Sequence, residues 1–415
     1  MTDSTLPSRN RLHPLEGIER HNIKVTDLKV TLLSIEYPPE EQLRVVKGIW
    51  WKSDSILVEI FTDQGIVGLG GASRYSGAGC CLPVKAYLEE VVKPNLIGRN
   101  PFDVDTFAWG GKSGVGRSAW AGAEAALLDI VGKACGLPVY ELLAIDAEPT
   151  TRLRVYASAG VKYAWYDRPD QLVEEAAYVK EQGFTAYKFR PGTDWEYSGM
   201  TVDKFIPYLE RVREAVGPDF DLALETRPWS LDEALHLAPV LEALHFTWFE
   251  EALGRAGDDA IERHVQLQEA LPNVMLSGGE GMLSLHELKE WFDRGAYDML
   301  QPDAGRIGLL EACRLVRMAA MAGKPFCPHN WGDGSCTLAN AALVAASPNA
   351  LMLEQFETFD PLRTEIFIDP LVVIDGHMQL PNKPGFGVEL AADLEAKFPY
   401  LPGGYSARPN PVICG

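Results

Sequence analysis

Short apolar runs alternate with amphipathic segments over most of the chain after residue 150. The amphipathic segments, for example residues 171–183 and 206–217, carry apolar positions at helical spacing. Strands alternating with such helices form βαβ units and a parallel sheet. The apolar runs occupy residues 155–160, 186–192, 221–226, 246–252, 274–280, 298–303, 324–330 and 350–356. Eight units over about 220 residues predict a closed (β/α) barrel. The alternative is an open, doubly wound sheet, but no glycine-rich dinucleotide motif follows any of the runs.

The first 150 residues follow a different pattern. Residues 24–35 alternate between apolar and polar positions, and residues 55–73 predict two further strands around a tight turn. Residues 118–144 are rich in Ala and Leu at helical spacing, with a stop and restart at a Gly-Leu-Pro sequence. These features predict an α+β domain that precedes the barrel.

The patterns divide the chain into three parts. We expect the α+β domain over residues 1–150 and the barrel over residues 151–375. Residues 376–415 no longer fit the repeat, and we expect them to return to the first domain.

A long segment, residues 37–54, joins two of the predicted N-terminal strands and is rich in Pro, basic residues and Trp. A loop of this length within a compact domain is usually functional or mobile. We expect it to close over the mouth of the barrel together with the segment around Arg74 and Tyr75. Trp50 would then lie beside the substrate.

The net charge indicates which kinds of partner to expect, and the cysteines indicate the cell compartment. The chain has 58 acidic against 38 basic residues and a formal net charge of −20. This argues against nucleic acid or an anionic membrane as a partner, because phosphate groups need clustered Lys and Arg. No apolar run approaches the length of a membrane span, and the first twenty residues lack the apolar core of a signal peptide. The seven cysteines are odd in number without CxxC spacing, so we expect free thiols and a cytoplasmic location.

Ionisable residues stand at the ends of the predicted barrel strands, where barrel enzymes carry their active sites. From Glu225 onward one such residue ends each βα unit, and successive residues are 23 to 30 positions apart. The residues are Lys188, Arg190, Glu225, Glu250, Glu280, Asp303, His329 and Glu354. A single strand-end carboxylate is usually an exposed charge. Seven consecutive units that each end in an ionisable residue at the same relative position indicate a functional site.

Three successive units end in Glu. Three converging carboxylates repel one another unless a cation lies between them. Carboxylates without clustered His or Cys suit Mg²⁺ or Mn²⁺ rather than Zn²⁺. Glu250 and Glu251 point to opposite faces of their strand, so only one of them can be a ligand, and the spacing does not say which.

A histidine and two cations complete the constellation. Asp303 ends the strand before that of His329, close enough in a barrel to orient the imidazole and stabilise its cation. This suits a general base or acid near neutral pH. Lys188 and Arg190 are two residues apart, so they face the same side of their strand and supply positive charge opposite the His.

Taken together, these motifs resemble the mandelate racemase and muconate lactonizing enzyme family of the enolase superfamily, along nearly the whole chain. The motifs are SAWAGAEAALLDIVGKACGLPVYELLA, AYKFR, LET, WFEEA, SGGE, QPD, PHN and LEQF. The resemblance implies a TIM-like (β/α)7β barrel with an N-terminal α+β capping domain that the C-terminal segment completes.

The resemblance also implies roles for the residues. Glu225, Glu250 and Glu280 would bind Mg²⁺, and Asp303 and His329 would form the dyad of the mandelate racemase branch. Glu354 would hydrogen-bond the substrate carboxylate, a role that suits a protonated or strongly paired acid. Lys188 and Arg190 would be catalytic. The remaining candidates line the substrate, and they are Arg227, Asn330, Trp331, Trp50, Arg74 and Tyr75.

Four positions depart from the family pattern. Glu225 stands where Asp is usual and is followed by Arg227 in place of Asn, and Ala252 replaces a Pro. Arg190 stands where the second Lys is normally the catalytic base. Arginine keeps its proton at neutral pH, which argues against chemistry with two bases.

The favoured hypothesis is dehydration of a sugar acid. His329 removes the α-proton, an enediolate forms, and loss of the β-hydroxyl as water gives a 2-keto-3-deoxy acid. A racemase or epimerase using Lys188 and His329 on opposite faces is the first alternative, and a sugar-lactone cycloisomerase is the second. A relative that binds without catalysis is the third, and the retained Glu, Asp–His and Lys188 set weighs against it. We expect a small-molecule carboxylate as the partner and a homo-oligomer.

Overall fold

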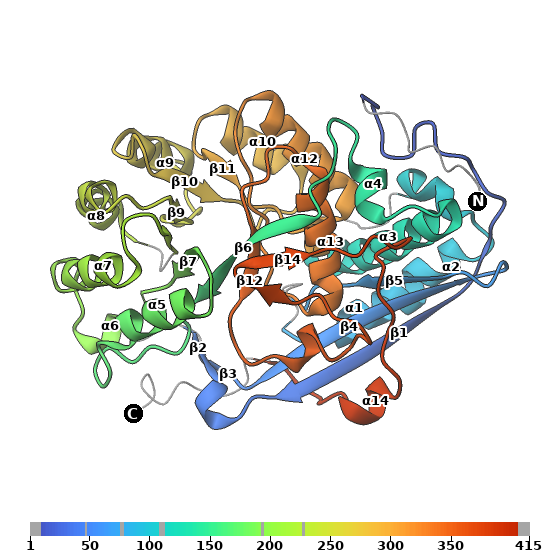
Figure 1. Cartoon of the computed structure of the whole chain (residues 1–415), viewed down its shortest axis with the longest axis horizontal. Helices are drawn as coiled ribbons and strands as arrows, with labels where there is room; N and C mark the ends of the chain where they lie inside the picture. Colours follow the sequence, from blue (N-terminus) through green and yellow to red (C-terminus); the bar gives the residue numbers. More distant parts are fainter. Residues whose placement is uncertain are drawn as a thin grey trace.

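The protein is described by a computed structural model that covers residues 10–45, 48–74, 79–107, 113–191, 195–225 and 229–405. A parallel barrel and an antiparallel capping sheet lie side by side (Figure 1). Both parts of the predicted fold class, the barrel and the α+β domain before it, are confirmed. Within the described residues no helix is long and apolar enough to cross a membrane.

The barrel strands run in chain order and pair in parallel. They are β6 (Arg152–Ala159), β7 (Ala186–Phe189), β8 (Asp221–Leu224), β9 (Trp248–Glu250), β10 (Met275–Gly278), β11 (Met299–Leu300) and β12 (Leu353–Phe356). β12 pairs with β6, and bridges from Phe326 to Leu300 and to Ala350 complete the circle. The strand predicted over residues 324–330 is therefore reduced to one bridging residue, because backbone pairing there reaches only Phe326.

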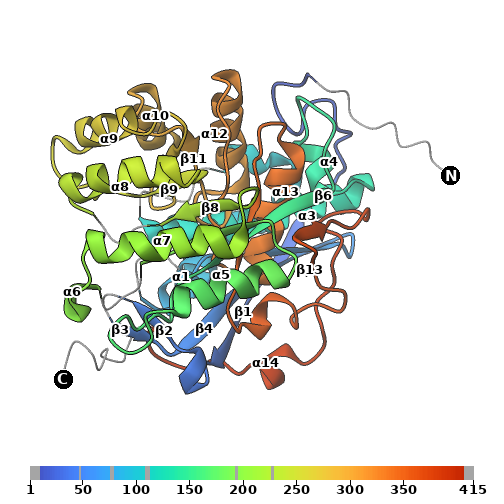
Figure 2. The same cartoon turned by 60° about the vertical axis from the view of Figure 1, so that its left-hand side comes forward.

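Helices cover the outside of the barrel (Figure 2). They are α5 (Gln171–Glu181), α7 (Val202–Val216), α8 (Leu231–Ala243), α9 (Ala260–Glu269), α10 (Leu285–Asp293), α12 (Leu309–Met321) and α13 (Gly334–Ala346). The short helices α6 (Trp195–Ser198) and α11 (Ala304–Ile307) follow β7 and β11. In α7 one face is buried at helical spacing, through Val202, Phe205, Leu209, Val212 and Val216. Ser230 begins α8 with a capping box to Glu233.

The interior of the barrel is built in layers. One apolar layer takes a buried residue from most strands: Tyr156, Ala186, Ala223, Trp248, Met299, Cys327 and Met352. Side chains two residues further along a strand point the same way. The next layer toward the carboxyl ends therefore consists of Ser158, Lys188, Glu225, Glu250, Gln301, His329 and Glu354. The apolar layer forms a floor beneath this polar layer and closes the barrel to water from the other end.

The capping sheet is antiparallel with the order β1 (Val25–Glu36), β4 (Lys52–Thr62) and β5 (Val67–Gly71). The long helix α3 (Gly114–Cys135) packs directly on β5. A Cβ at Gly68 would lie 2.1 Å from the Ala126 carbonyl oxygen, and one at Gly70 2.1 Å from that of Gly122. Glycine is required at both positions because strand and helix backbones touch there.

Short elements complete the domain. They are a 3-10 helix at Pro39–Glu41, α1 (Leu82–Tyr87), a π-helical turn at Leu88–Val92, α2 (Lys93–Leu96), a 3-10 helix at Pro101–Thr106 and α4 (Val139–Leu143). The predicted break between two helices in this region is confirmed, since α3 ends at Gly136 in the left-handed conformation and α4 begins at Val139.

The prediction of a long loop over residues 37–54 is wrong in part. β2 (Leu43–Val45) and β3 (Gly48–Trp50) pair as an antiparallel hairpin, and β4 already begins at Lys52. Leu43 anchors the hairpin because its side chain is fully buried. The backbone N–H of Arg44 donates to the carbonyl of Val161 just after β6, so the hairpin lies at the carboxyl end of the barrel.

The C-terminal part of the chain touches both domains. β14 (His377–Gln379) pairs with β6 of the barrel and with β13 (Val373–Ile374). α14 (Leu394–Lys397) then lies beside β1, as both cartoons show (Figures 1 and 2), and Pro399 bridges to Leu33 of that strand. We propose that the return to the capping domain begins after β14.

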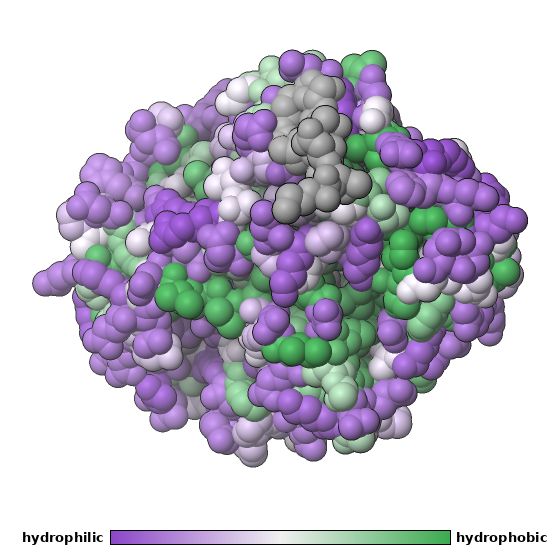
Figure 3. Space-filling model, turned by 45° about the vertical axis from the view of Figure 1, so that its right-hand side comes forward, coloured by the Kyte–Doolittle hydropathy of each residue, from purple (hydrophilic) through white to green (hydrophobic). Residues whose placement is uncertain are grey.

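The face drawn in Figure 3 is largely purple, with separate green groups of apolar residues between the polar ones. The exposed large apolar side chains include Ile368, Val372 and Ile374, which lie close together in the chain. The six described cysteines are all free thiols, and Cys414 lies outside the described residues.

Candidate active site

Lys188 lies at the centre of the polar layer. Its side chain is fully buried, and its Nζ lies 2.9 Å from Glu225 Oε2, 2.5 Å from Glu250 Oε1 and 2.9 Å from Glu354 Oε1. Burial alone would lower the pKa of Lys188, but these three carboxylates raise it well above its ordinary value. Lys188 is therefore an ammonium group at neutral pH.

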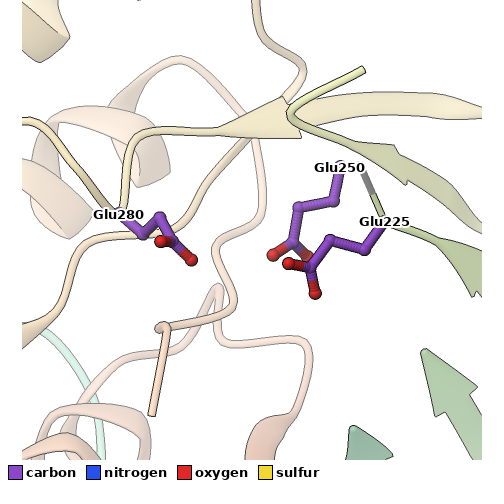
Figure 4. A group of neighbouring side chains, drawn as sticks. All are labelled: Glu225, Glu250 and Glu280. Carbon is purple, nitrogen blue, oxygen red and sulfur yellow. The ribbon is translucent and has the colours of Figure 1, made fainter. Parts of the chain in front are cut away.

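Three carboxylates converge beside this lysine. Glu225, Glu250 and Glu280 each offer one oxygen, and the three oxygens lie within 4.8 Å of one another. Figure 4 shows the carboxylate of Glu280 facing those of Glu225 and Glu250 from the opposite side. Burial raises the pKa of Glu250 to about 7, against the opposing effect of Lys188. The negative charges are thus held close together at a cost that a cation would relieve.

The backbone conformation determines which of the adjacent Glu250 and Glu251 belongs to the carboxylate cluster. Glu250 ends β9 and points into the barrel, where Trp248 Nε1 and Gln301 Nε2 donate to its Oε2 at 3.0 and 2.6 Å. Glu251 has a φ of 39° and lies near Arg255, with the closest N–O distance at 3.9 Å. Only Glu250 of the pair belongs to the carboxylate cluster.

These three residues fit a hard divalent cation. The donors are all carboxylate oxygens with no sulfur or imidazole among them, the set that Mg²⁺ and Mn²⁺ prefer. Lys188 reaches two of the three carboxylates, while Glu280 lies apart from it and its side chain is 26% exposed. The cluster is thus accessible from the side of Glu280.

Asp303 and His329 form a buried pair. His329 Nδ1 lies 2.9 Å from Asp303 Oδ2, and its Nε2 faces Glu280 Oε2 at 3.4 Å. Burial alone would lower the pKa of His329, but the carboxylates of Glu280 and Asp303 raise it to about 9. Asp303 is itself fixed by the N–H of Gly305 and by Asn340 Nδ2, at 2.8 and 3.2 Å. The imidazole is thus held with Nε2 turned toward the carboxylate cluster.

Glu354 is strongly paired. Its oxygens accept from the backbone N–H of Asn330 at 2.6 Å and from Trp331 Nε1 at 3.0 Å, in addition to the contact with Lys188. Burial would raise the pKa of Glu354, but Lys188 and His329 hold it far below its ordinary value. Glu354 is therefore ionised and strongly paired rather than protonated. It has no proton to donate to a substrate carboxylate.

Arg190 follows β7 on the same side as Lys188 and forms an ion pair with Glu225. Its guanidinium lies 3.9 Å from the ring centroid of Trp331. Trp331 meets Trp50 of the hairpin edge to face, with centroids 6.2 Å apart. The structure thus brings Arg190, Trp331 and Trp50 together at the mouth.

Two other candidates lie deeper than the sequence predicts. Asn330 is buried, and its side-chain amide bonds to Thr337 and to the backbone of Glu354. Arg74 is also buried; its Nη atoms donate to the carbonyl oxygens of Asp54 and Trp331, each at 3.2 Å. The bond to Trp331 ties the cap to the barrel, whereas the bond to Asp54 lies within the cap. The candidates Tyr75 and Arg227 lie outside the described residues.

Sequence reasoning missed several polar residues around the site. Ser158 and Gln301 belong to the polar layer, and Trp248 lies below Glu250 on the same strand. The two-residue alternation along β9 and β11 could have identified Trp248 and Gln301. Asn340 donates to Asp303 from α13, and its only signal is a buried amide in the otherwise apolar residues 338–346 of that helix.

Comparisons with known proteins give consistent matches. Residues 39–144 match the model described as "Mandelate racemase / muconate lactonizing enzyme, N-terminal domain", and residues 171–394 match "Enolase C-terminal domain-like". The chain is 28% identical to the D-xylonate dehydratase of Haloferax volcanii, over 95% of this chain and 92% of that protein. It is 29% identical to the D-galactarolactone cycloisomerase of Agrobacterium fabrum, over 83% and 90%. A solved structure of an enolase superfamily member from Polaromonas sp. JS666 superposes with a TM-score of 0.79 at 26% identity, covering 92% and 99%.

Proposed function

We propose that this chain, which belongs to the mandelate racemase and muconate lactonizing enzyme family of the enolase superfamily, is a magnesium-dependent hydro-lyase that dehydrates a sugar acid. The observation that carries the proposal is the Asp303–His329 pair, whose Nε2 faces a cluster of three carboxylates across the barrel mouth. The relative of that activity named above supports it.

Glu225, Glu250 and Glu280 would hold Mg²⁺, which supplies charge to stabilise the electron density that builds on a substrate carboxylate. The ammonium of Lys188 adds a second fixed positive charge in the same buried layer. It is preorganised, because three carboxylates hold it and no water need reorient when charge develops. Glu354, ionised and fixed by Asn330 and Trp331, would then act by positioning Lys188.

His329 is the proposed base. A cation held by Glu280 would offset the negative charge that raises the pKa of this imidazole, and so would favour its neutral form. It removes the α-proton at Nε2, while Asp303 accepts a hydrogen bond from Nδ1 and stabilises the imidazolium. The same imidazolium is then the nearest proton donor for the departing β-hydroxyl. The product is an enol that tautomerises to a 2-keto-3-deoxy acid.

We infer that His329 is the only base, because the face of the substrate opposite His329 would meet Arg190. Arg190, which stands where a second base would be, keeps its proton at neutral pH and cannot serve as that base. This argues against the racemase and epimerase alternative, which needs a neutral base on each face. We propose a cytoplasmic location, which the free cysteines of the described residues support, and a homo-oligomer.

The second candidate is a sugar-lactone cycloisomerase, favoured by the similarity to the D-galactarolactone cycloisomerase. Both reactions begin with the same proton abstraction, and they differ in whether the β-leaving group is a free hydroxyl or a ring oxygen.

The test is a screen of acid sugars and sugar lactones for 2-keto acid formation, with and without added Mg²⁺. We expect an acid sugar to be turned over, and activity to disappear in excess EDTA and return with Mg²⁺ or Mn²⁺. Glu280→Gln should be inactive while its circular dichroism spectrum is unchanged. Turnover of lactones only would establish the cycloisomerase, and full activity in EDTA would refute the metal requirement.

A further inference from the structure

Arg190 is held in a fixed position at the end of β7. Its Nη2 forms an ion pair with Glu225, and its Nη1 donates to the carbonyl oxygen of Ala159 at 3.3 Å. The guanidinium also lies over the ring of Trp331, 3.9 Å from the centroid, and the side chain is only 15% exposed. A guanidinium that bonds in its plane and stacks on its face has little freedom to move. The charge of Arg190 therefore stays beside Glu225.

The ring that supports Arg190 is itself fixed. Trp331 is buried, and its Nε1 donates to Glu354 at 3.0 Å. Its ring stacks on that of Phe356 in β12, with centroids 3.9 Å apart and an angle of 22° between the planes. Movement of Arg190 away from Glu225 would therefore cost the stacking contact as well as the ion pair.

Glu225 is a carboxylate of the cluster that two cations contact. Its Oε2 lies 2.9 Å from Lys188 Nζ, and Arg190 pairs with the same carboxylate. Lys188 is shared, because its Nζ also lies 2.5 Å from Glu250 and 2.9 Å from Glu354. Removing Arg190 would therefore change the charge at Glu225 and leave the centre of the polar layer in place.

The charges of this layer match those of a divalent cation. Leaving the Asp303–His329 pair aside, four ionised carboxylates and the two cations Lys188 and Arg190 leave a net charge of −2, which one Mg²⁺ would cancel. The carboxylates are those of Glu225, Glu250, Glu280 and Glu354. Without the charge of Arg190 the same groups would carry −3 and attract a metal ion more strongly.

Arg190 has two opposing effects on a metal ion at this cluster. By ordering the side chain of Glu225 it favours binding, which changes a Kd by at most about tenfold. By its charge it repels the metal. A unit charge roughly 5 Å from a divalent cation changes the Kd by more than about a hundredfold, even at an effective dielectric constant of about 20. Lys188 still orders Glu225 when Arg190 is replaced, so the repulsion outweighs the ordering.

We propose that Arg190 is a positioning residue that holds Glu225 in place and lowers the affinity of the three-carboxylate site for Mg²⁺. This rests on the proposed function, in which Glu225, Glu250 and Glu280 hold the metal. Because Arg190 partly neutralises these carboxylates, more of the charge of the metal remains available to a substrate carboxylate. Arg190 thus acts on the reaction through Glu225 and not as a base.

The experiment measures Mg²⁺ binding without substrate, by isothermal titration calorimetry at pH 7 on protein freed of metal with EDTA and dialysed. Arg190→Gln should bind Mg²⁺ at least about tenfold more tightly than the unmutated protein. Arg190→Lys keeps a positive charge beside Glu225, so its Kd should stay within about threefold of the unmutated value. Misfolding would weaken binding, so a tighter site cannot result from a damaged fold.

Arg154→Gln is the matched control. Arg154 pairs with Asp221 at 2.6 Å, near the starts of β6 and β8 at the opposite end of the barrel, so the same change of charge there should leave the Kd within about twofold. Unchanged or weaker Mg²⁺ binding by Arg190→Gln would overturn the role of Arg190 and leave the proposed function intact. Equal tightening in Arg154→Gln or Arg190→Lys would overturn it as well. If none of the proteins binds Mg²⁺, the metal site fails, and the proposed function fails with this inference.

Discussion

Replacing Lys188 by Met tests whether the site is held together by charge. Lys188 is fully buried and pairs with Glu225, Glu250 and Glu354. Methionine has a similar length and no charge, so the substitution leaves buried carboxylates without their counterion. Removing one partner of a buried pair costs about 3–5 kcal/mol in the free energy of unfolding. For a barrel of this size the melting temperature should fall by on the order of 10 °C.

The loss should depend on pH in a defined direction. Burial already raises the pKa of Glu250 to about 7, and removing Lys188 raises it further. A carboxyl group whose pKa is higher in the folded than in the unfolded state contributes stability at low pH, and this stability is lost as the pH rises through the folded-state value. The free energy of unfolding of the Lys188→Met protein should therefore be closer to that of the unmutated protein at pH 6 than at pH 8.5.

Mg²⁺ should compensate for the missing ammonium, because it brings positive charge to the same carboxylates. Saturating Mg²⁺ should raise the melting temperature of Lys188→Met more than that of the unmutated enzyme. The assay is thermal unfolding followed by circular dichroism at both pH values, with EDTA or Mg²⁺. Lys162→Met is the control, since Lys162 pairs with Glu41 at the surface with its side chain 31% exposed, and such pairs contribute about 0–1 kcal/mol. If both variants lose the same stability, or the loss at Lys188 is independent of pH, the reasoning fails.

Three further predictions concern the base, the hairpin and the domain seam. His329→Asn should abolish both dehydration and exchange of the substrate α-proton with D₂O, whereas Asp303→Asn should weaken both less, because the imidazole remains without its orienting partner. Exchange that persists in His329→Asn, followed by NMR with each epimer, would favour the epimerase. Trp50→Ala should change KM or substrate range more than stability, and a loss of several kcal/mol in urea unfolding would mark Trp50 as a core residue. Glu124 of α3 accepts from the N–H of Leu310 at 3.1 Å, and burial raises its pKa from 4.5 to about 7. Its protonation thus favours folding at low pH, so Glu124→Gln should gain up to about 3 kcal/mol relative to the unmutated protein between pH 5 and 8, measured by urea unfolding. A constant difference would refute this.

The periodicity of the chain predicts most of the barrel because local chemistry dictates it. A short apolar run between amphipathic helices has few other ways to bury its side chains, and the strands from β6 to β12 lie within the predicted runs apart from three N-terminal residues of β6. The same periodicity predicts which ionisable groups meet. Residues that end successive parallel strands must converge at one end of the barrel, as Glu225, Glu250 and Glu280 do.

What the sequence could not decide depends on contacts between distant segments. The choice of Glu250 over Glu251 follows from the backbone turn after β9, where Glu251 takes a positive φ. The sequence predicts that Arg74 contacts the substrate. Only its hydrogen bonds to the carbonyls of Asp54 and Trp331 show that it joins the cap to the barrel. Tyr405 lies far beyond Trp50 in the chain, and no local pattern predicts that their rings lie 5.0 Å apart. Alternation and helical spacing record how each segment buries its own apolar face. The pairing of such remote residues is set by how the finished elements pack, and that information appears only in the tertiary structure.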